Sequence, residues 1–248
     1  MGGMNEKSPP VPRKPGEPPA KSRSGSSEVE AFIAQARALQ PSSLAGGRLI
    51  LALDATMSRQ PTWDLACRVQ AEMFDAVGNP PGRLSVQLVY FRGFGECRAS
   101  KFVTDTKALK DLMVRIDCRG GHTQIGKVLS HALRENTRQK VNAVVFIGDA
   151  MEEEIDDLAE KAGQLGLQGV PVFLFQEGAD TAVERAFREI ARLSKGAWFR
   201  FDRNAAATLA RLLSAVALFA TGGQKALAAR GRPEDRLLIE NLRGGGAR

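Results

Sequence analysis

The sequence has few of the residues on which several common classes of protein depend. Its 248 residues include three cysteines, two tryptophans, one tyrosine and two histidines. An odd, sparse set of cysteines without a Cys-x-x-Cys pair indicates reduced thiols in an intracellular protein and not a disulfide framework. No basic patch alternates with aromatic side chains, and the chain has only one tyrosine and two tryptophans, so the composition gives little support for nucleic-acid binding.

Several enzyme and targeting motifs are also absent. The chain has no G-x-x-x-x-G-K-[ST] motif, no G-x-S-x-G motif and no G-x-G-x-x-G motif after a strand, which argues against an ATPase, a serine hydrolase and a dinucleotide enzyme. Residues 1–16 lack the apolar core of a signal peptide. The longest apolar stretch, near residues 212–220, is too short to span a bilayer. We therefore expect a cytoplasmic protein with no membrane contact.

The remaining composition is that of an ordinary globular protein, with 43% apolar and 25% charged residues. The net charge of +7 is concentrated in the flanks: residues 1–47 carry six Lys/Arg against four Glu (+2), and residues 222–248 carry six against three acids (+3). The other +2 belongs to residues 48–221. Basic flanks can attract nucleic acid or acidic partners, but tail charge that promotes solubility is the simpler interpretation.

The flanking segments differ from the centre of the chain. Residues 1–26 are rich in Pro, Ser, Gly and Lys and are predicted to be a disordered tail. Residues 27–46 are predicted to form a short helix and a linker, with one apolar face made by Val29, Phe32, Ile33, Ala36 and Leu39. Residues 222–248 form a basic tail, in which Pro233 and the apolar residues up to Leu242 predict a short amphipathic helix.

Residues 47–221 alternate between strand and helix patterns about six times. This alternation predicts an α/β fold: a doubly wound, mostly parallel sheet of about six strands with helices on both faces. The third strand is shorter and less apolar, so we expect it to be antiparallel and at an edge. The expected strands are Leu49–Leu53, Leu84–Phe91, Cys97–Val103, Val141–Ile147, Val170–Phe175 and Ala197–Phe201. The expected helices are Trp63–Val77, Thr106–Ile116, Ile125–Asn136, Glu153–Leu165, Thr181–Leu193 and Ala205–Ala220.

Polar side chains follow two of the apolar strands. Asp54, Thr56 and Ser58 follow the first strand, and Asp149 follows the strand that ends at Ile147. Thr123 follows a pair of glycines at the start of a helix. Because open α/β sheets bind ligands at the carboxyl ends of their strands, these oxygen groups can converge on a hard divalent cation.

Each of these features also has a simpler explanation. Asp54 could cap the loop that follows it, and Thr123 could be an ordinary helix N-cap. The acidic run Glu152-Glu153-Glu154 suits the dipole of the helix that it opens, so we interpret it as a solvated helix start and not as further metal ligands.

Taken together, the five positions resemble the metal-ion-dependent adhesion site (MIDAS) of the von Willebrand factor A (VWA) domain family. That pattern is Asp-x-Ser/Thr-x-Ser followed by a distant Thr and a distant Asp, and the resemblance covers about residues 47–221, a Rossmann-like domain. It implies that Thr56 and Ser58 ligate Mg²⁺ or Mn²⁺ through their hydroxyls, and that Thr123 binds directly or through water. Asp54 and Asp149 would supply negative charge through water-mediated contacts, and one coordination position would stay open for a partner's carboxylate.

The sequence departs from the family pattern at three positions. Thr56 replaces the commoner Ser, which the pattern tolerates. Ala150 stands where the family usually has Gly after the last Asp, and its methyl group is expected to crowd that loop. His122 replaces a common Gly, and we interpret it as a bystander or a partner contact. His131, on the following helix, is expected to be a surface or packing residue.

The resemblance implies an intracellular, divalent-metal-dependent protein-interaction module that is not an enzyme and has no catalytic residues. Bacterial relatives often serve AAA-type ATPases, chelatase-like complexes or stress-response operons, so a separate ATPase is one candidate partner. A Mg²⁺-dependent hydrolase or phosphotransferase of related α/β shape is an alternative. Haloacid-dehalogenase-type phosphatases, however, have Asp-x-Asp after the first strand, where this chain has Thr56 as the second residue. A second alternative is nucleic-acid binding through the basic tails.

Overall fold

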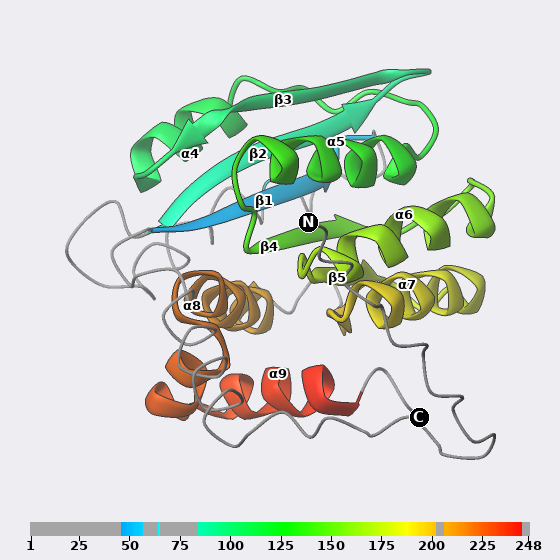
Figure 1. The fold of residues 1–248 in the computed structure, drawn as a ribbon. Helices are drawn as coiled ribbons and strands as arrows, with labels where there is room; N and C mark the ends of the chain where they lie inside the picture. The colour runs from blue at the N-terminus through cyan, green and yellow to red at the C-terminus, as the bar shows by residue number, and fades with distance from the viewer. Residues whose placement is uncertain (1–45, 57–63, 65–83, 202–205, 245–248) are drawn as a thin grey trace, which may run out of the picture. The chain divides into compact units, whose positions relative to one another are not determined.

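The chain folds around one central β-sheet, shown in a computed structural model that describes residues 46–56, 64, 84–201 and 206–244 (Figure 1). Residues Ser43–Arg248 belong to one compact unit. Three predicted segments lie outside the described residues: the disordered tail at 1–26, the helix at 29–39 and, except for Asp64, the helix at 63–77.

The sheet has six strands in the order β3-β2-β1-β4-β5-β6. All neighbouring strands are parallel except β2 and β3, which are antiparallel at the edge. The predicted fold class is therefore confirmed, and so is the antiparallel edge strand. The strands are β1 (Gly47–Asp54), β2 (Leu84–Arg92), β3 (Glu96–Val103), β4 (Ala143–Gly148), β5 (Val172–Glu177) and β6 (Ala197–Phe201).

Helices cover both faces of the sheet (Figure 1). Helices α5, α6 and α7 pack on one face, and α4 and α8 pack on the other. Most helices start within two residues of their predicted positions, because apolar periodicity identifies the buried stripe directly. The bounds are α4 (Thr106–Met113), α5 (Ile125–Arg138), α6 (Ile155–Leu167), α7 (Thr181–Ser194), α8 (Ala206–Arg230) and α9 (Pro233–Gly244).

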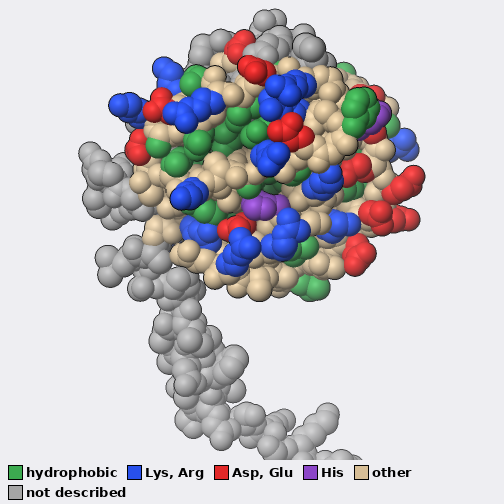
Figure 2. Space-filling view, turned by 90° about the horizontal axis from the view of Figure 1, so that it is seen from above, with side chains coloured by type: hydrophobic (Ala, Val, Ile, Leu, Met, Phe, Trp, Pro, Cys, Tyr) green, Lys and Arg blue, Asp and Glu red, His purple; other side chains and the backbone are tan. Residues whose placement is uncertain are grey.

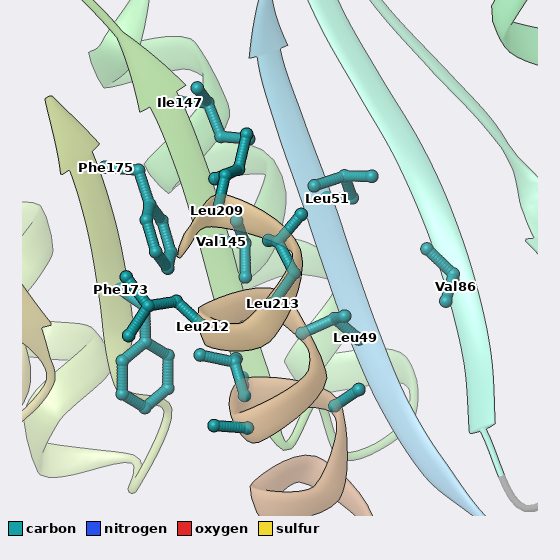
Figure 3. Packing of buried hydrophobic residues seen from close by; sticks show 14 of the residues in the cluster. Leu49, Leu51, Val86, Val145, Ile147, Phe173, Phe175, Leu209, Leu212 and Leu213 are labelled. Carbon is teal, nitrogen blue, oxygen red and sulfur yellow. The ribbon is translucent and has the colours of Figure 1, made fainter. Parts of the chain in front are cut away.

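The continuous apolar strands bury side chains on both faces of the sheet. In β1, Leu49 and Leu51 contribute to the core on the α8 side, where Leu213 packs (Figure 3). The alternate residues Ile50 and Ala52 belong to the core under α5, α6 and α7. Both faces are therefore buried, which explains why these strands show no polar alternation.

Helix α8 is longer than predicted. It continues past Ala220 to Arg230 through a kink at Gly223, whose φ is 62°. By length and composition alone, Ala207–Arg230 could cross a membrane, which differs from our expectation for residues 212–220. Its Leu209 and Val216 are buried in the core beside the sheet. In α9, which follows, Leu238 is fully buried in the same core.

Candidate metal-binding site

Asp54 and Asp149 lie at the carboxyl ends of two neighbouring parallel strands. Leu53 of β1 pairs with Ile147 of β4. The next residues in register are Asp54 and Gly148, and Asp149 directly follows Gly148. Adjacent strands are about 4.8 Å apart. The chain builds the sheet outward in opposite directions from β1 and β4, which makes this edge the topological switch point where open α/β sheets hold ligands.

The backbone after β1 is shaped by the side chain of Asp54. Its Oδ1 accepts a hydrogen bond from the Thr56 amide at 2.8 Å, while the Ala55 amide donates to the carbonyl of Phe91 at 3.0 Å. Asp54 is only 4% exposed and Thr56 only 8%. Both residues are therefore buried at the carboxyl end of β1. Ser58, the third residue of the predicted motif, lies outside the described residues.

The loop before α5 lies over the ends of β1 and β2. The Arg119 amide donates to the carbonyl of Ala55 at 2.9 Å, and the His122 amide donates to the carbonyl of Gly93 at 3.3 Å. These bonds hold the loop at the same sheet edge as Asp54. Thr123, which follows His122, is 7% exposed there.

Thr123 is held by a reciprocal pair of hydrogen bonds with Glu152. The Thr123 amide donates to Glu152 Oε2, and the Glu152 amide donates to Thr123 Oγ1, both at 3.0 Å. His122 Nδ1 lies 3.1 Å from the same Oε2. The hydrogen bond from the Thr123 amide is the main reason that the pKa of the Glu152 carboxyl is lowered, and His122 adds to the effect. Thr123 is therefore not the N-cap of α5, a position that Gln124 occupies.

The next acid, Glu153, caps the N-terminus of α5. Its two carboxylate oxygens accept from the amides of Ile125 and Gly126 at 2.5 and 2.9 Å. Helix α6 begins only at Ile155. The interpretation of this acidic run as a solvated start of its own helix therefore holds only for Glu154, the exposed N-cap of α6. It is wrong for Glu152 and Glu153, which satisfy amides of α5 and its preceding loop. Only the general preference of helix N-termini for anions pointed to this role.

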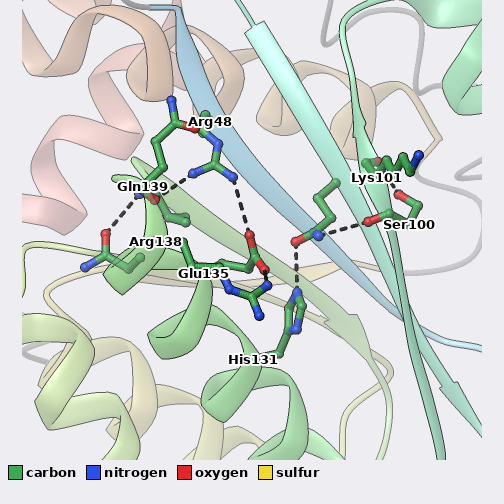
Figure 4. Close-up of polar contacts among 10 residues, drawn as sticks. Arg48, Ser100, Lys101, His131, Glu135, Arg138 and Gln139 are labelled. Carbon is green, nitrogen blue, oxygen red and sulfur yellow. Dashed lines mark hydrogen bonds and ion pairs between the residues drawn. The ribbon is translucent and has the colours of Figure 1, made fainter.

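The two remaining sequence expectations concern Ala150 and His131. Among the described non-glycine residues only Lys195 has a positive φ, so the backbone at Ala150 needs no glycine. His131 lies away from the site, where its Nε2 is 2.9 Å from Oε1 of Gln87 on β2 (Figure 4). Burial lowers the pKa of this imidazole, opposed by the nearby charge of Glu135. His131 is thus a packing residue between α5 and the sheet.

The donor atoms at this edge suit a hard divalent cation. Within the described part of the chain no group of three His, Cys, Asp or Glu side chains could hold a metal ion. The candidate site instead combines two carboxylates with the hydroxyls of Thr56 and Thr123. Because a hydroxyl oxygen has two lone pairs, Thr123 Oγ1 can accept the Glu152 amide and still face a ligand. All-oxygen donors of this kind fit Mg²⁺ or Mn²⁺.

A separate surface cavity of about 590 Å³ lies beside α5, between β3 and α6. Basic side chains are numerous on the face that contains it (Figure 2). Lys127 and Arg134 of α5 and Arg98 of β3 line the cavity, but Glu154 and Asp157 line it as well. The mixed charges give no clear preference for an anionic ligand.

No protein-family profile and no curated protein sequence matches the chain, but solved structures do. An aerotolerance-related membrane protein from Bacteroides fragilis is 22% identical, with a TM-score of 0.52 over 68% of this chain and 98% of that one. The ArnB paralog VWA2 from Sulfolobus acidocaldarius is 16% identical, with a TM-score of 0.51 over 70% and 46%. Proximal thread matrix protein 1 from the mussel byssus, solved with a zinc-occupied MIDAS motif, is 14% identical, with a TM-score of 0.55 over 70% and 46%.

These likenesses place the chain in a structural class. Its fold is that of VWA domains, the Rossmann-like architecture that the five-residue pattern predicts. The chain spans nearly all of the Bacteroides structure but less than half of the other two.

Proposed function

We propose that this chain is a protein-interaction module that binds a partner's carboxylate through a divalent-metal site. The main supporting observation is the register of β1 and β4, because it brings Asp54 and Asp149 to the same sheet edge. The buried hydroxyls of Thr56 and Thr123 at that edge add neutral oxygen donors.

In this proposal, Thr56, Ser58 and Thr123 hold the ion with their hydroxyls, and Asp54 and Asp149 supply its counter-charge. When bound, Mg²⁺ or Mn²⁺ would offer an open coordination position to a carboxylate. Because Asp54 and Asp149 would act through water, the ion would have no charged direct ligand, so an acidic side chain from a partner is a favourable last ligand. Asp54 is oriented by the Thr56 amide and Thr123 by Glu152, so the donors need little rearrangement to bind.

The partner is a separate protein that presents an acidic residue, and an AAA-type ATPase is our candidate. A cytoplasmic location follows from the same proposal. The mussel protein with zinc in its MIDAS motif supports metal binding by this fold. For this chain, the all-oxygen donor set favours Mg²⁺ or Mn²⁺, because zinc prefers nitrogen and sulfur ligands.

The proposal assigns no catalytic step to the chain. Phosphoryl transfer of the Asp-x-Asp kind needs a carboxylate at position 56, and the chain has a threonine there. An ion that is held by hydroxyl ligands and has one open coordination position can bind a partner's carboxylate, and this binding needs no nucleophile. Incubation with a general phosphatase substrate and Mg²⁺ should therefore give no turnover above that of Asp54→Asn.

Thermal unfolding with increasing Mg²⁺ or Mn²⁺ tests the site directly. Asp54→Asn is the sharpest variant, because its amide oxygen can still accept from Thr56 while the charge is lost. A ligand that binds only the folded state at 100 times its Kd stabilises that state by about 2.7 kcal/mol. We expect the Tm of the wild type to rise by several degrees and that of Asp54→Asn to stay constant.

Asp111→Asn, at an exposed acid on α4, is the matched control and should respond as the wild type does. Equal responses from the wild type and Asp54→Asn would contradict the proposal. So would a wild-type Tm that is unchanged up to about 10 mM of either ion, a concentration about ten times the Kd of the weakest biological Ca²⁺ sites.

A further inference from the structure

Phe94 stands at the tip of the β2–β3 hairpin and is 86% exposed. It lies between Gly93 and Gly95, whose φ values of 61° and 138° form the tight turn. An exposed aromatic ring gains almost nothing from burial on folding. The folded chain alone therefore gives little reason for a large apolar residue at this tip.

The tip is fixed to the loop that carries the candidate site. A side chain at Gly121 would place its Cβ 2.2 Å from the carbonyl oxygen of Gly93, so the two backbones are in direct contact. Lys127 Nζ donates to the carbonyl of Gly95 at 2.9 Å. The ring of Phe94 packs edge-on against His122, with centroids 5.1 Å apart. The exposed ring is thus presented from an anchored turn.

The ring contacts His122, and His122 directly precedes the candidate ligand Thr123. Consecutive Cα atoms are about 3.8 Å apart. In an extended peptide, side chains two positions apart lie on the same side and are separated by roughly 6.6 Å. A peptide whose carboxylate reaches Thr123 could therefore place a neighbouring side chain on Phe94.

We propose that Phe94 and His122 form a contact rim that binds an apolar side chain lying two positions from the partner's metal-bound carboxylate. This inference rests on the proposed function and specifies its partner as an extended segment with an Asp or Glu and an apolar residue two positions away. Aromatic residues are typical centres of protein interfaces, and His122 supplies a second ring surface.

The charges around the rim suit such an acidic segment. Arg119, in the same loop, is exposed, and Lys127 makes its described hydrogen bonds only to oxygens of Gly95 and Gln124. Two acids near the rim are already engaged: Glu152 with His122 and the Thr123 amide, and Glu96 with Arg92 and Arg98. An acidic partner would therefore meet the side chains of Arg119 and Lys127 near the ion.

The test uses phage-displayed linear peptides with one fixed central Asp and all other positions randomised. The full chain with Mg²⁺ is the target, in the wild type, Phe94→Ala and Leu167→Ala. Leu167 is 87% exposed on α6 and serves as the matched control. We expect wild type and Leu167→Ala to enrich Leu, Phe, Trp or Met two positions from the Asp, and Phe94→Ala to lose that preference. The best peptide should bind Phe94→Ala about tenfold more weakly.

The outcomes separate this inference from the proposed function. Mg²⁺-dependent binding that is unchanged in Phe94→Ala would overturn the rim and leave the metal site standing. Binding that needs Phe94 but survives chelation of Mg²⁺ would overturn the metal-dependent mechanism, and with it the placement of the apolar side chain relative to a metal-bound carboxylate. No enrichment by the wild type over an unrelated protein would overturn both.

Discussion

Thr123 and Glu152 hold each other through two hydrogen bonds of 3.0 Å, each from the backbone amide of one residue to the side chain of the other. The two residues are 29 positions apart and belong to the loops before α5 and after β4. The arrangement fixes the Thr123 hydroxyl while its second lone pair stays available. We therefore expect Glu152 to act as a positioning residue for the candidate site.

Replacing Glu152 should weaken metal binding without removing a ligand. We expect Glu152→Ala to lower Mg²⁺ affinity about tenfold, because loss of a group that orients a ligand typically has an effect of this size. Glu152→Gln should retain part of the affinity, since its amide oxygen can still accept from Thr123. Isothermal titration with Mg²⁺ measures both. Glu154→Ala is the control, and an equal loss in that variant would contradict the positioning role.

The same contact predicts a pH dependence of stability. The pKa of Glu152 is lowered in the folded state from its ordinary value of 4.5, chiefly by the Thr123 amide. Its charge therefore contributes stability that is fully present above about pH 4.5 and is lost as the pH falls through the lower folded-state pKa. The difference in unfolding free energy between the wild type and Glu152→Gln should shrink over that acidic range. A difference that stays constant from pH 7 to below pH 4 would refute this linkage.

Two adjacent glycines in the loop give a direct test of its contact with the hairpin tip. A Cβ at Gly121 would lie 2.2 Å from the Gly93 carbonyl, whereas a Cβ at Gly120 meets nothing within 4 Å. Gly121→Ala should cost about 1–3 kcal/mol of unfolding free energy, as overpacking does, and should also weaken Mg²⁺ binding by moving Thr123. Gly120→Ala should change neither by much. Urea unfolding and Mg²⁺ titration of the two variants measure both effects, and similar results for both would disprove the contact.

Much of the sheet could be predicted because its signal is local. Runs such as Leu49–Leu53 are apolar on both faces, which suits a parallel strand covered by helices, and the structure has β1 there. The edge position of β3 followed from its lower apolar content. The resemblance to VWA domains then assigned Asp54 and Asp149 to one edge, and the observed register agrees with that placement.

The contacts that shape the site could not be predicted in the same way. Nothing in the run Glu152-Glu153-Glu154 indicates that Glu153 caps α5, because the partner amides lie 27 and 28 residues earlier. Propensity arguments assigned these acids to the helix that follows them, whereas tertiary packing directs Glu153 to the N-terminus of α5. The end of α8 was misplaced for a related reason. We expected this helix to end at Ala220, but it kinks at Gly223 and continues to Arg230.

The pairing of Arg230 and Asp235 predicts that α9 unfolds together with the rest of the domain. Asp235 is fully buried, and its Oδ2 accepts from Arg230 Nε at 2.8 Å and from the Arg232 amide at 3.0 Å. Arg230 also donates to Ser214 Oγ of α8 at 2.9 Å. Removing one partner of a buried ion pair leaves the other charge uncompensated, which costs about 3–5 kcal/mol.

Asp235→Ala should therefore lower the free energy of unfolding by about 3 kcal/mol or more. Urea denaturation, followed by a signal that reports on the packed core, measures this change. Glu240→Ala, at an exposed acid of the same helix, should change it by less than about 0.5 kcal/mol. A single transition shifted to lower urea in Asp235→Ala would show that α9 belongs to the cooperative unit. An unchanged midpoint would mean that α9 detaches before the sheet unfolds, and Leu238 would then contribute little to the core.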